Sequence, residues 1–333
     1  FREINIWKEI RPFAEPIKRI KVMDRKISNL LEFDNQRRGS NLGYIVKNKK
    51  LLDVLYKKIN NKKNIKVFNN TEIFSIDNLG EKISTTSKHI KVISDLNIAA
   101  DGKKSFVKQF YKTSLYFKDY KKKALVLTFA HSKNHNGTAY EFFYKDGPLA
   151  ILPMNSNKNN FNSSIVWTNN NDYIDSLLEM NSKQIISILS QATKNCLGDI
   201  KKILSIQSFP LSAHLNSKFF EKRLIYIGDS AHSFHPIAGQ GWNLGINDLQ
   251  NLLSLAYKYK HLGIELGTHD FCKKYHEENF FNAYRLYQIT DKLDKIFKIQ
   301  NSLFYLGRSS GIKFINNNKS VKNFISDFAM GVN

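Results

Sequence analysis

The sequence is poor in cysteine, proline and acidic residues. It has 333 residues but only 2 cysteines and 6 prolines. Cys196 and Cys272 are too few for a disulfide framework and too far apart for a metal clip, so they indicate a reducing compartment and a cytoplasmic location. With 24% charged residues and 16 glycines, the composition also excludes a disordered or collagen-like chain.

Long apolar runs are also missing. A helix that crosses a bilayer needs about 20 apolar residues in succession, and the best run, Ala124 to Ala130, is far shorter. The sequence therefore predicts no membrane-spanning helix. Hydrophobic residues still make up 42% of the chain, which is enough to fill the core of one large domain or two smaller ones.

Negative charge is scarce, with 29 Asp and Glu against 51 Lys and Arg and a formal net charge of +22. Basic surfaces attract anionic lipid and nucleic acid. Because the lysines are spread in short groups among many Asn and Ile residues, an ordinary solvated surface is the favoured interpretation, and contact with lipid is the second. The sequence contains no helix-turn-helix, zinc or RNA-binding signature, so a nucleic-acid partner is not predicted.

The order of predicted elements indicates an α/β protein. Apolar residues at helical spacing predict a helix over 48–59, followed by a short strand over 65–68. Strands are expected over 72–76 and 89–98, with a turn region over 78–87 between them.

A strand-rich region is predicted between Lys121 and Trp167, where Asp146-Gly147 marks a hairpin turn. The rest of the chain is mainly helical, apart from an apolar strand over 224–227. Helices are predicted over residues 172–180, 182–196, 245–259, 271–291 and 293–306.

The stretch with the most chemical information follows the apolar strand 224–227, which is of the kind buried in a parallel sheet. The strand ends at Gly228-Asp229, and a helix opens near Asn243. Three glycines stand in its approach: Gly239, Gly241 and Gly245. The N–H groups and dipole of a helix N-terminus favour negative charge, and Asp229 can hold a sugar hydroxyl. A cofactor loop is favoured over a turn whose glycines serve packing alone.

Residues 235–248, His-Pro-Ile-Ala-Gly-Gln-Gly-Trp-Asn-Leu-Gly-Ile-Asn-Asp, resemble the FAD-contacting signature of the flavin-dependent aromatic hydroxylases, in particular those of ubiquinone biosynthesis. The resemblance implies that Asp229 binds the ribityl chain and that the backbone of Gly241 to Asn243 faces the pyrimidine end of the isoalloxazine. A helix N-terminus there stabilises a negatively charged reduced flavin without reorganisation. The cofactor-binding residues implied in this stretch are Pro236, Gly239, Gln240, Gly241, Trp242 and Asn243.

Residues 100–108, Ala-Asp-Gly-Lys-Lys-Ser-Phe-Val-Lys, resemble the Asp-Gly motif of the same family. The resemblance places Asp101 near the FAD pyrophosphate and the nicotinamide access. Lys108 stands where the family usually has Arg, and it lacks the bidentate fork of a guanidinium for phosphate.

Three weaker matches follow the same order. Residues 41–52 resemble the segment before another FAD contact of the family, with Asn48 as the candidate. Residues 147–153 and 164–168 resemble strands of the family's substrate sheet.

Family members begin with a strand, a Gly-x-Gly-x-x-Gly turn and a helix, which hold the ADP half of FAD. This chain begins at Phe1, without Met, and contains no such element. The sequence is therefore predicted to be a family member without its first βαβ portion, with weakened FAD binding and an exposed sheet edge.

The predicted fold is a three-layer, Rossmann-like α/β FAD-binding domain, incomplete at its N-terminal end, interleaved with a mixed β-sheet substrate domain and C-terminal helices. The FAD-binding domain is expected over residues 1–110 and 220–333. The substrate domain is expected over 111–219, with an early contribution from about 12–45.

The resemblance implies an FAD-dependent monooxygenase of ubiquinone biosynthesis that hydroxylates a polyprenylated phenol with NAD(P)H and O2. A polyprenyl substrate partitions into lipid, which predicts peripheral contact with the inner face of the membrane, aided by basic surface and by aromatic residues such as Phe297, Phe304 and Tyr305. A ubiquinone-biosynthesis complex is a further expected partner. The alternatives are another aromatic hydroxylase, a prenyl-lipid reductase, and a non-catalytic remnant or assembly partner.

The catalytic residues stay open at this level. Four side chains are candidates for a general base that faces a phenol: His89, His131, His214 and Tyr144. His232 and His235 lie three residues apart, but no nearby Cys or Glu completes a ligand set, so no metal is predicted.

Overall fold

The structure is a computed structural model that describes residues 1, 4–24, 31–34, 41–157, 160–234, 241–298, 315, 317–318 and 320–322. The chain divides into two compact units. Unit 1 comprises Phe1–Val67, Lys121–Leu211 and Lys295–Asn333, and unit 2 comprises Phe68–Tyr120 and Ser212–Asp294. Each unit has its own hydrophobic core.

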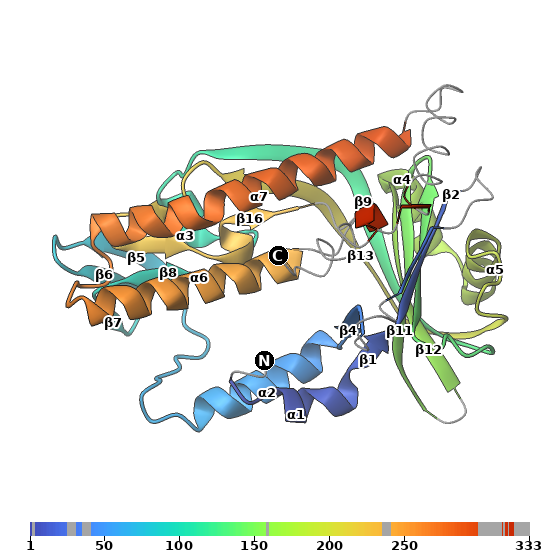
Figure 1. The fold of residues 1–333 in the computed structure, drawn as a ribbon, viewed down its shortest axis with the longest axis horizontal. Coiled ribbons are helices and arrows are strands. Elements are labelled where there is room, and N and C mark those ends of the chain that lie inside the picture. The colour runs from blue at the N-terminus through green and yellow to red at the C-terminus, as the bar shows by residue number, and fades with distance from the viewer. Residues whose placement is uncertain are drawn as a thin grey trace. The chain divides into compact units, whose positions relative to one another are not determined.

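The largest sheet has eight strands (Figure 1). In hydrogen-bonded order they are β16 (His232–Ser233), β13 (Ile200–Asn216), β9 (Leu115–His131), β12 (Asn160–Asn170), β11 (Gly147–Asn157), β10 (Thr138–Tyr144), β2 (Arg19–Asp24) and β3 (Leu31–Asp34). Strands β9, β12, β11 and β10 pair antiparallel, whereas β10 pairs with β2 in parallel. The predicted mixed sheet is confirmed, although β13 was not anticipated as a strand.

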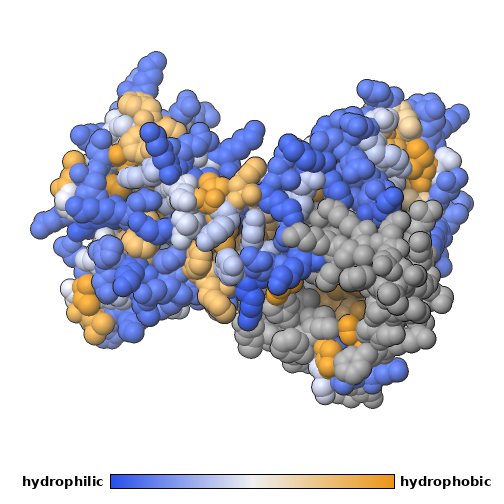
Figure 2. Space-filling view, turned by 90° about the horizontal axis from the view of Figure 1, so that it is seen from above, coloured by the Kyte–Doolittle hydropathy of each residue, from blue (hydrophilic) through white to orange (hydrophobic). Residues whose placement is uncertain are grey.

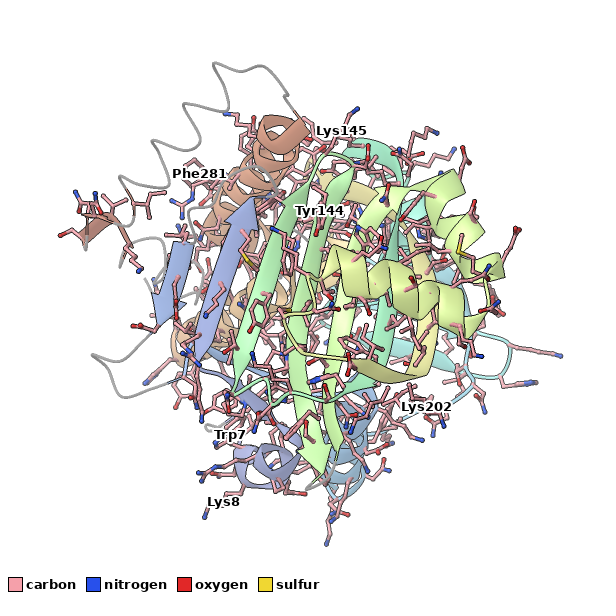
Figure 3. The ribbon with its side chains drawn as sticks, turned by 90° about the vertical axis from the view of Figure 1, so that its right-hand side faces the viewer. Trp7, Lys8, Tyr144, Lys145, Lys202 and Phe281 are labelled. Carbon is pink, nitrogen blue, oxygen red and sulfur yellow. The ribbon has the colours of Figure 1, made fainter. Side chains whose placement is uncertain are left out.

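Helices α4 (Asn171–Glu179) and α5 (Ser182–Ala192) cover one face of this sheet (Figure 3). Because side chains alternate between the two faces of a strand, Phe142 and Ile165 point to this side and pack in one core with Leu189. Both predicted helices are confirmed. Tyr144 pairs with Gly147, which confirms the predicted hairpin turn.

The N-terminal part of unit 1 forms a small layer of its own. Its elements are α1 (Trp7–Ile10), the 3-10 helix η1 (Arg11–Phe13), β1 (Glu15–Ile17), β4 (Gly43–Ile45) and α2 (Asn48–Asn60). Helix α2 confirms the prediction over 48–59. The predicted strand over 65–68 is wrong, because these described residues form an exposed loop without a neighbouring strand to complete their hydrogen bonds.

Unit 2 is built on two three-stranded sheets. The first has the order β14 (Phe220–Glu221), β15 (Leu224–Tyr226) and β8 (Asn97–Ala99), and the second the order β5 (Ile73–Asn78), β6 (Ile83–Ser87) and β7 (Lys91–Ser94). Strand β15 is fully buried and pairs with β8 in parallel, as predicted. Among the described residues β8 is an edge strand of its sheet, with Ile98 46% exposed.

The helices of unit 2 are α3 (Phe106–Phe110), the 3-10 helix η3 (Gly228–Ser230), α6 (Gly241–His261) and α7 (His269–Lys298). Side chains of α6 and α7, such as Leu252 and Tyr275, share a core with β15. Two predictions in this unit are wrong. The turn region over 78–87 contains strand β6, which pairs on both sides, and the single strand over 89–98 is two strands in different sheets.

Helix α7 also corrects the prediction of separate helices over 271–291 and 293–306, since it runs without a break to Lys298. The remainder of the second range lies outside the described residues. In the part of the chain that the structure describes, no helix is long and apolar enough to cross a membrane. Hydrophilic residues cover most of the face shown in Figure 2, and hydrophobic residues form separate patches on it.

Gly267 is expected to tolerate no side chain. It has φ +86°, and a Cβ built on it would overlap the carbonyl oxygen of Asp95. Gly263 is a matched control, because it also has a positive φ of +71° but no neighbour within 4 Å of a built Cβ. We expect Gly267→Ala to lower the free energy of unfolding by about 2 kcal/mol more than Gly263→Ala in urea denaturation. Equal losses would contradict the crowding at Gly267.

Candidate cofactor site

The site in unit 2 starts at the turn that follows strand β15. Gly228 begins this turn with φ +58°, and Asp229 behind it is exposed. Ser230 ties the turn to two strands, because its Oγ accepts a hydrogen bond from Ile227 N–H at 3.1 Å and donates to the carbonyl of Ala99 on β8. The turn therefore presents Asp229 from a fixed backbone at the carboxyl end of a parallel strand.

A buried carboxylate of α6, that of Asp248, holds the same turn. Asp248 Oδ2 accepts from Gly228 N–H at 2.9 Å and lies 2.7 Å from Nε2 of His232. The side chains of Asp248 and His232 are 0% and 1% exposed. His232 also stacks on Phe234, with ring centroids 5.2 Å apart. One carboxylate oxygen thus joins α6 to both ends of the turn, and this role of Asp248 was not foreseen from the sequence.

The third part of the site is the N-terminus of α6, which begins at Gly241 and so confirms the helix expected near Asn243. Its first turn contains no acidic residue, so its N–H dipoles are not offset by a nearby carboxylate. Trp242 is 57% exposed, and Gly245 lies against the turn, with a built Cβ 3.5 Å from Gly228 Cα. Pro236, Gly239 and Gln240 lie outside the described residues.

Asp101 follows strand β8 at the start of the loop before α3. Its Oδ2 accepts from Val107 N–H at 3.1 Å, and Ser105 Oγ caps the same helix by accepting from Lys108 N–H at 3.0 Å. Gly102 adopts φ +80°, which accounts for glycine at this position. Asp101 is exposed and follows β8, which pairs with β15 in parallel. The structure therefore brings the Asp101 and Asp229 loops together at the carboxyl ends of these two strands.

Two lysines that follow Asp101 in the chain make hydrogen bonds with strand β13, one of them with His214. Lys108 Nζ is 2.9 Å from His214 Nε2 and donates to the carbonyl of Lys103 at 3.2 Å. Lys103 Nζ donates to the carbonyl of Ser212 at 2.8 Å. Burial lowers the pKa of both ammonium groups. The ammonium of Lys108, which stands at the family's Arg position, is therefore engaged inside the protein.

His214 is expected to make this fold sensitive to acid. Burial, followed by the positive charge of Lys108, lowers the pKa of His214 to about 3. The unfolded chain then binds a proton at His214 at a higher pH than the folded chain, so stability is lost as the pH falls from about 6.5 towards 3. Replacing His214 by Gln should reduce the loss of unfolding free energy between pH 7 and 4.5 by about 2 kcal/mol. Urea denaturation at both pH values measures it.

The exposed His89→Gln variant is the control for His214, and it should keep the pH dependence of the unchanged chain. If His214→Gln and the unchanged chain lose the same unfolding free energy between pH 7 and 4.5, His214 is not the source of the acid sensitivity.

Two other base candidates, His131 and Tyr144, are engaged in hydrogen bonds inside the protein. His131 is fully buried, with Nε2 at 2.9 Å from Ser163 Oγ and Nδ1 at 2.9 Å from the carbonyl of Lys133. The Tyr144 hydroxyl donates to the carbonyl of Ala192. Asn48 is the exposed first residue of α2 and belongs to unit 1.

The comparisons with known proteins point to one family. Residues 1–278 match the family described as "FAD binding domain". The chain belongs to the FAD binding domain family. It is 27% identical to the ubiquinone hydroxylase UbiL of Rhodospirillum rubrum, over 98% of this chain and 76% of that protein. It is 24% identical to the mitochondrial ubiquinone biosynthesis monooxygenase COQ6 of Drosophila melanogaster, over 99% of this chain and 77% of that protein.

Solved structures agree on the fold. The p-nitrophenol 4-monooxygenase PnpA of Pseudomonas putida superposes with a TM-score of 0.75 at 13% identity, covering 98% of this chain and 83% of that one. HpxO of Klebsiella pneumoniae, solved with FAD, gives a TM-score of 0.73 at 12% identity, covering 99% of this chain and 86% of that one. The predicted resemblance to ubiquinone-biosynthesis flavin hydroxylases, the α/β flavoprotein fold and FAD as cofactor are confirmed.

The residues of the site fit a flavin nucleotide. The carboxylate of Asp229 is exposed and has no hydrogen-bond partner among the described residues, so it is available to hydroxyl groups of a ligand. The α6 N-terminus offers N–H groups and a positive dipole end to an electron-rich ring. An exposed carboxylate and a helix N-terminus at the same turn are groups of the kinds that suit a flavin nucleotide.

Proposed function

We propose that this chain is an FAD-dependent monooxygenase of ubiquinone biosynthesis that hydroxylates the ring of a polyprenylated phenol. The observation that carries the proposal is an exposed Asp229 on a turn locked to α6, in a chain of the FAD binding domain family. FAD, reduced by NAD(P)H, supplies the oxygen chemistry when bound. The curated relatives named as ubiquinone hydroxylases support the choice of substrate class.

The cofactor contacts in this proposal are Asp229, Asp101, Asn48, Pro236, Gly239, Gln240, Gly241, Trp242 and Asn243. The proposed FAD-binding domain spans residues 1–110 and 220–333, and the proposed substrate domain spans 111–219 with an early contribution from about 12–45. Peripheral contact with the membrane and membership of a ubiquinone-biosynthesis complex are parts of the same proposal, because a polyprenyl tail partitions into lipid.

Product analysis tests the reaction. The purified chain is incubated with FAD, NADH or NADPH and a farnesylated phenol under heavy-isotope oxygen gas, and the products are examined by mass spectrometry. We expect a product with one heavy oxygen atom on the ring, and its loss when FAD is omitted. FAD binding without any oxygenated product would contradict the monooxygenase and favour the non-catalytic alternative.

A further inference from the structure

The strands of the large sheet present a second face, opposite to the one covered by α4 and α5. Strand alternation assigns this face, since the residues between those of the helix-side core point away from it. We call it the second face, and the side chains that define it are Val126, Thr128, Ala150, Leu152, Ser164 and Val166. Most are partly exposed, and they are small or aliphatic. A surface of this kind suits an aromatic ring and an apolar tail.

Glu141 interrupts this apolar surface. It lies on β10 between Ala139 and Phe143, and its register partners are Val22 on β2 and Ala150 on β11. Within the described segments 124–130, 139–143, 148–154 and 164–168, Glu141 is the one ionisable side chain on the second face. The other side chains of these four segments on this face therefore offer no charge to compete for a polar group of a ligand.

The carboxylate of Glu141 does not stabilise the fold through any polar contact among the described residues. No hydrogen bond or ion pair with another described residue engages it. Burial raises its pKa to about 8. A half-buried polar group without a partner is costly to the fold, and such groups are concentrated at functional sites.

Neither of the two direct register partners of Glu141, Val22 and Ala150, is ionisable. Lys21 on β2 is opposite Tyr140 and therefore belongs to the helix side. Asp24 on β2 is the register partner of Phe143 and is therefore a second carboxylate position on this face, at the next register pair on this face after Glu141. On β1, which contacts β11, the Glu15 carboxylate lies 3.9 Å from His135 Nδ1.

We propose that Glu141 binds the ring hydroxyl of the aromatic substrate on the second face and accepts its proton. In this step the phenolic O–H bond breaks, its electron pair stays on the ring oxygen, and a carboxyl O–H bond forms on Glu141. The resulting phenolate is more electron-rich and reacts more readily with an electrophilic oxygen. The carboxyl later releases the proton to solvent, so no oxidant or reductant is consumed. This assignment rests on the proposed function.

The pH profile of hydroxylation tests the role of Glu141. A base must be ionised, so kcat/KM of the unchanged chain is expected to rise with pH to a plateau above about 8. In Glu141→Gln this rise of kcat/KM with pH should disappear, and kcat/KM at pH 8.5 should be about 100-fold lower than in the unchanged chain. Glu141→Asp keeps a carboxyl and should retain the rise of kcat/KM with pH, at a reduced rate. Glu32→Gln on β3, opposite Lys21 on the helix side, is the control and should match the unchanged chain.

The affinity for FAD should stay within twofold in all these variants, which excludes a general folding defect. An unaltered rise of kcat/KM with pH in Glu141→Gln would overturn the proposal.

A binding measurement separates this inference from the proposed function. A prenylated 4-nitrophenol reports its own ionisation by its yellow colour, without any turnover. When bound to the unchanged chain its titration should differ by at least about one pH unit from that in Glu141→Gln, because the two groups share a proton. Identical titrations, or failure of the probe to bind, would overturn the role of Glu141. A clear shift without any hydroxylated product would overturn only the proposed reaction.

Discussion

Asp248→Ala is expected to lower the free energy of unfolding by about 3 to 5 kcal/mol, the cost of removing one partner from a buried pair. The substitution removes the acceptor of both Gly228 N–H and His232 Nε2. His232 is 1% exposed, so water cannot readily replace the lost carboxylate. The loss should therefore exceed that of an ordinary surface substitution.

Urea denaturation followed by circular dichroism measures the effect of Asp248→Ala. Asn247→Ala is the matched control, because Asn247 is the exposed preceding residue of the same helix. We expect the control to stay within about 0.5 kcal/mol of the unchanged chain. If both variants unfold at the same urea concentration, Asp248 does not hold the turn as described.

Asp229→Ala should weaken FAD binding by about 10- to 100-fold, because hydrogen bonds to a charged group contribute about 1.5 to 3 kcal/mol. Unlike Asp248, the Asp229 side chain is exposed and has no hydrogen-bond partner among the described residues. Its removal should therefore leave the unfolding free energy almost unchanged. The two substitutions thus separate the group that would contact the cofactor from the group that holds the turn.

Equilibrium dialysis with FAD gives the two dissociation constants. The control is Asp77→Ala, which removes an exposed carboxylate from β5 in the same unit and should leave the FAD dissociation constant unchanged. The ratio between variant and unchanged chain is informative even where FAD binding is weak. An Asp229→Ala chain that binds FAD as well as the unchanged chain would remove Asp229 from the site.

Elements whose stability is encoded locally were predicted correctly. Helix α2 has a repeating apolar stripe, and Leu51 from that stripe packs on Ile6 and Ile10. Strand β15 is a short apolar run of the type buried on both faces, and it is completely buried.

The failures concern strands that depend on distant partners. Residues 65–68 have strand-forming side chains but no adjacent strand among the described residues, so they form an exposed loop. Strand β6 has the polar sequence Ile-Ser-Thr-Thr-Ser, which indicates a turn, yet it pairs with β5 and β7 on its two sides. Hydrogen bonds between strands do not follow from local composition, so these errors could not be avoided from single segments.

The candidate site shows the same division. The glycines, Asp229 and the start of α6 could be located because they are close in sequence and their types suit an anion-binding turn. His232 was considered only as a metal ligand, since nothing in the sequence reveals that Asp248 folds back onto it from the next helix. Glu141 carried one usable signal, an acidic residue within a strand of otherwise uncharged side chains.

The sequence by itself determined the family, the cofactor and the position of the Gly-Asp turn, because those depend on residue types at fixed short spacing. Only the tertiary structure decided which buried groups hold the turn and which carboxyl lies between apolar register partners on a sheet face. Asp248 and His232 meet because α6 packs on η3, and Glu141 has apolar neighbours because β2 and β11 place Val22 and Ala150 beside it. Such juxtapositions arise from packing between distant segments, which short-range patterns do not encode.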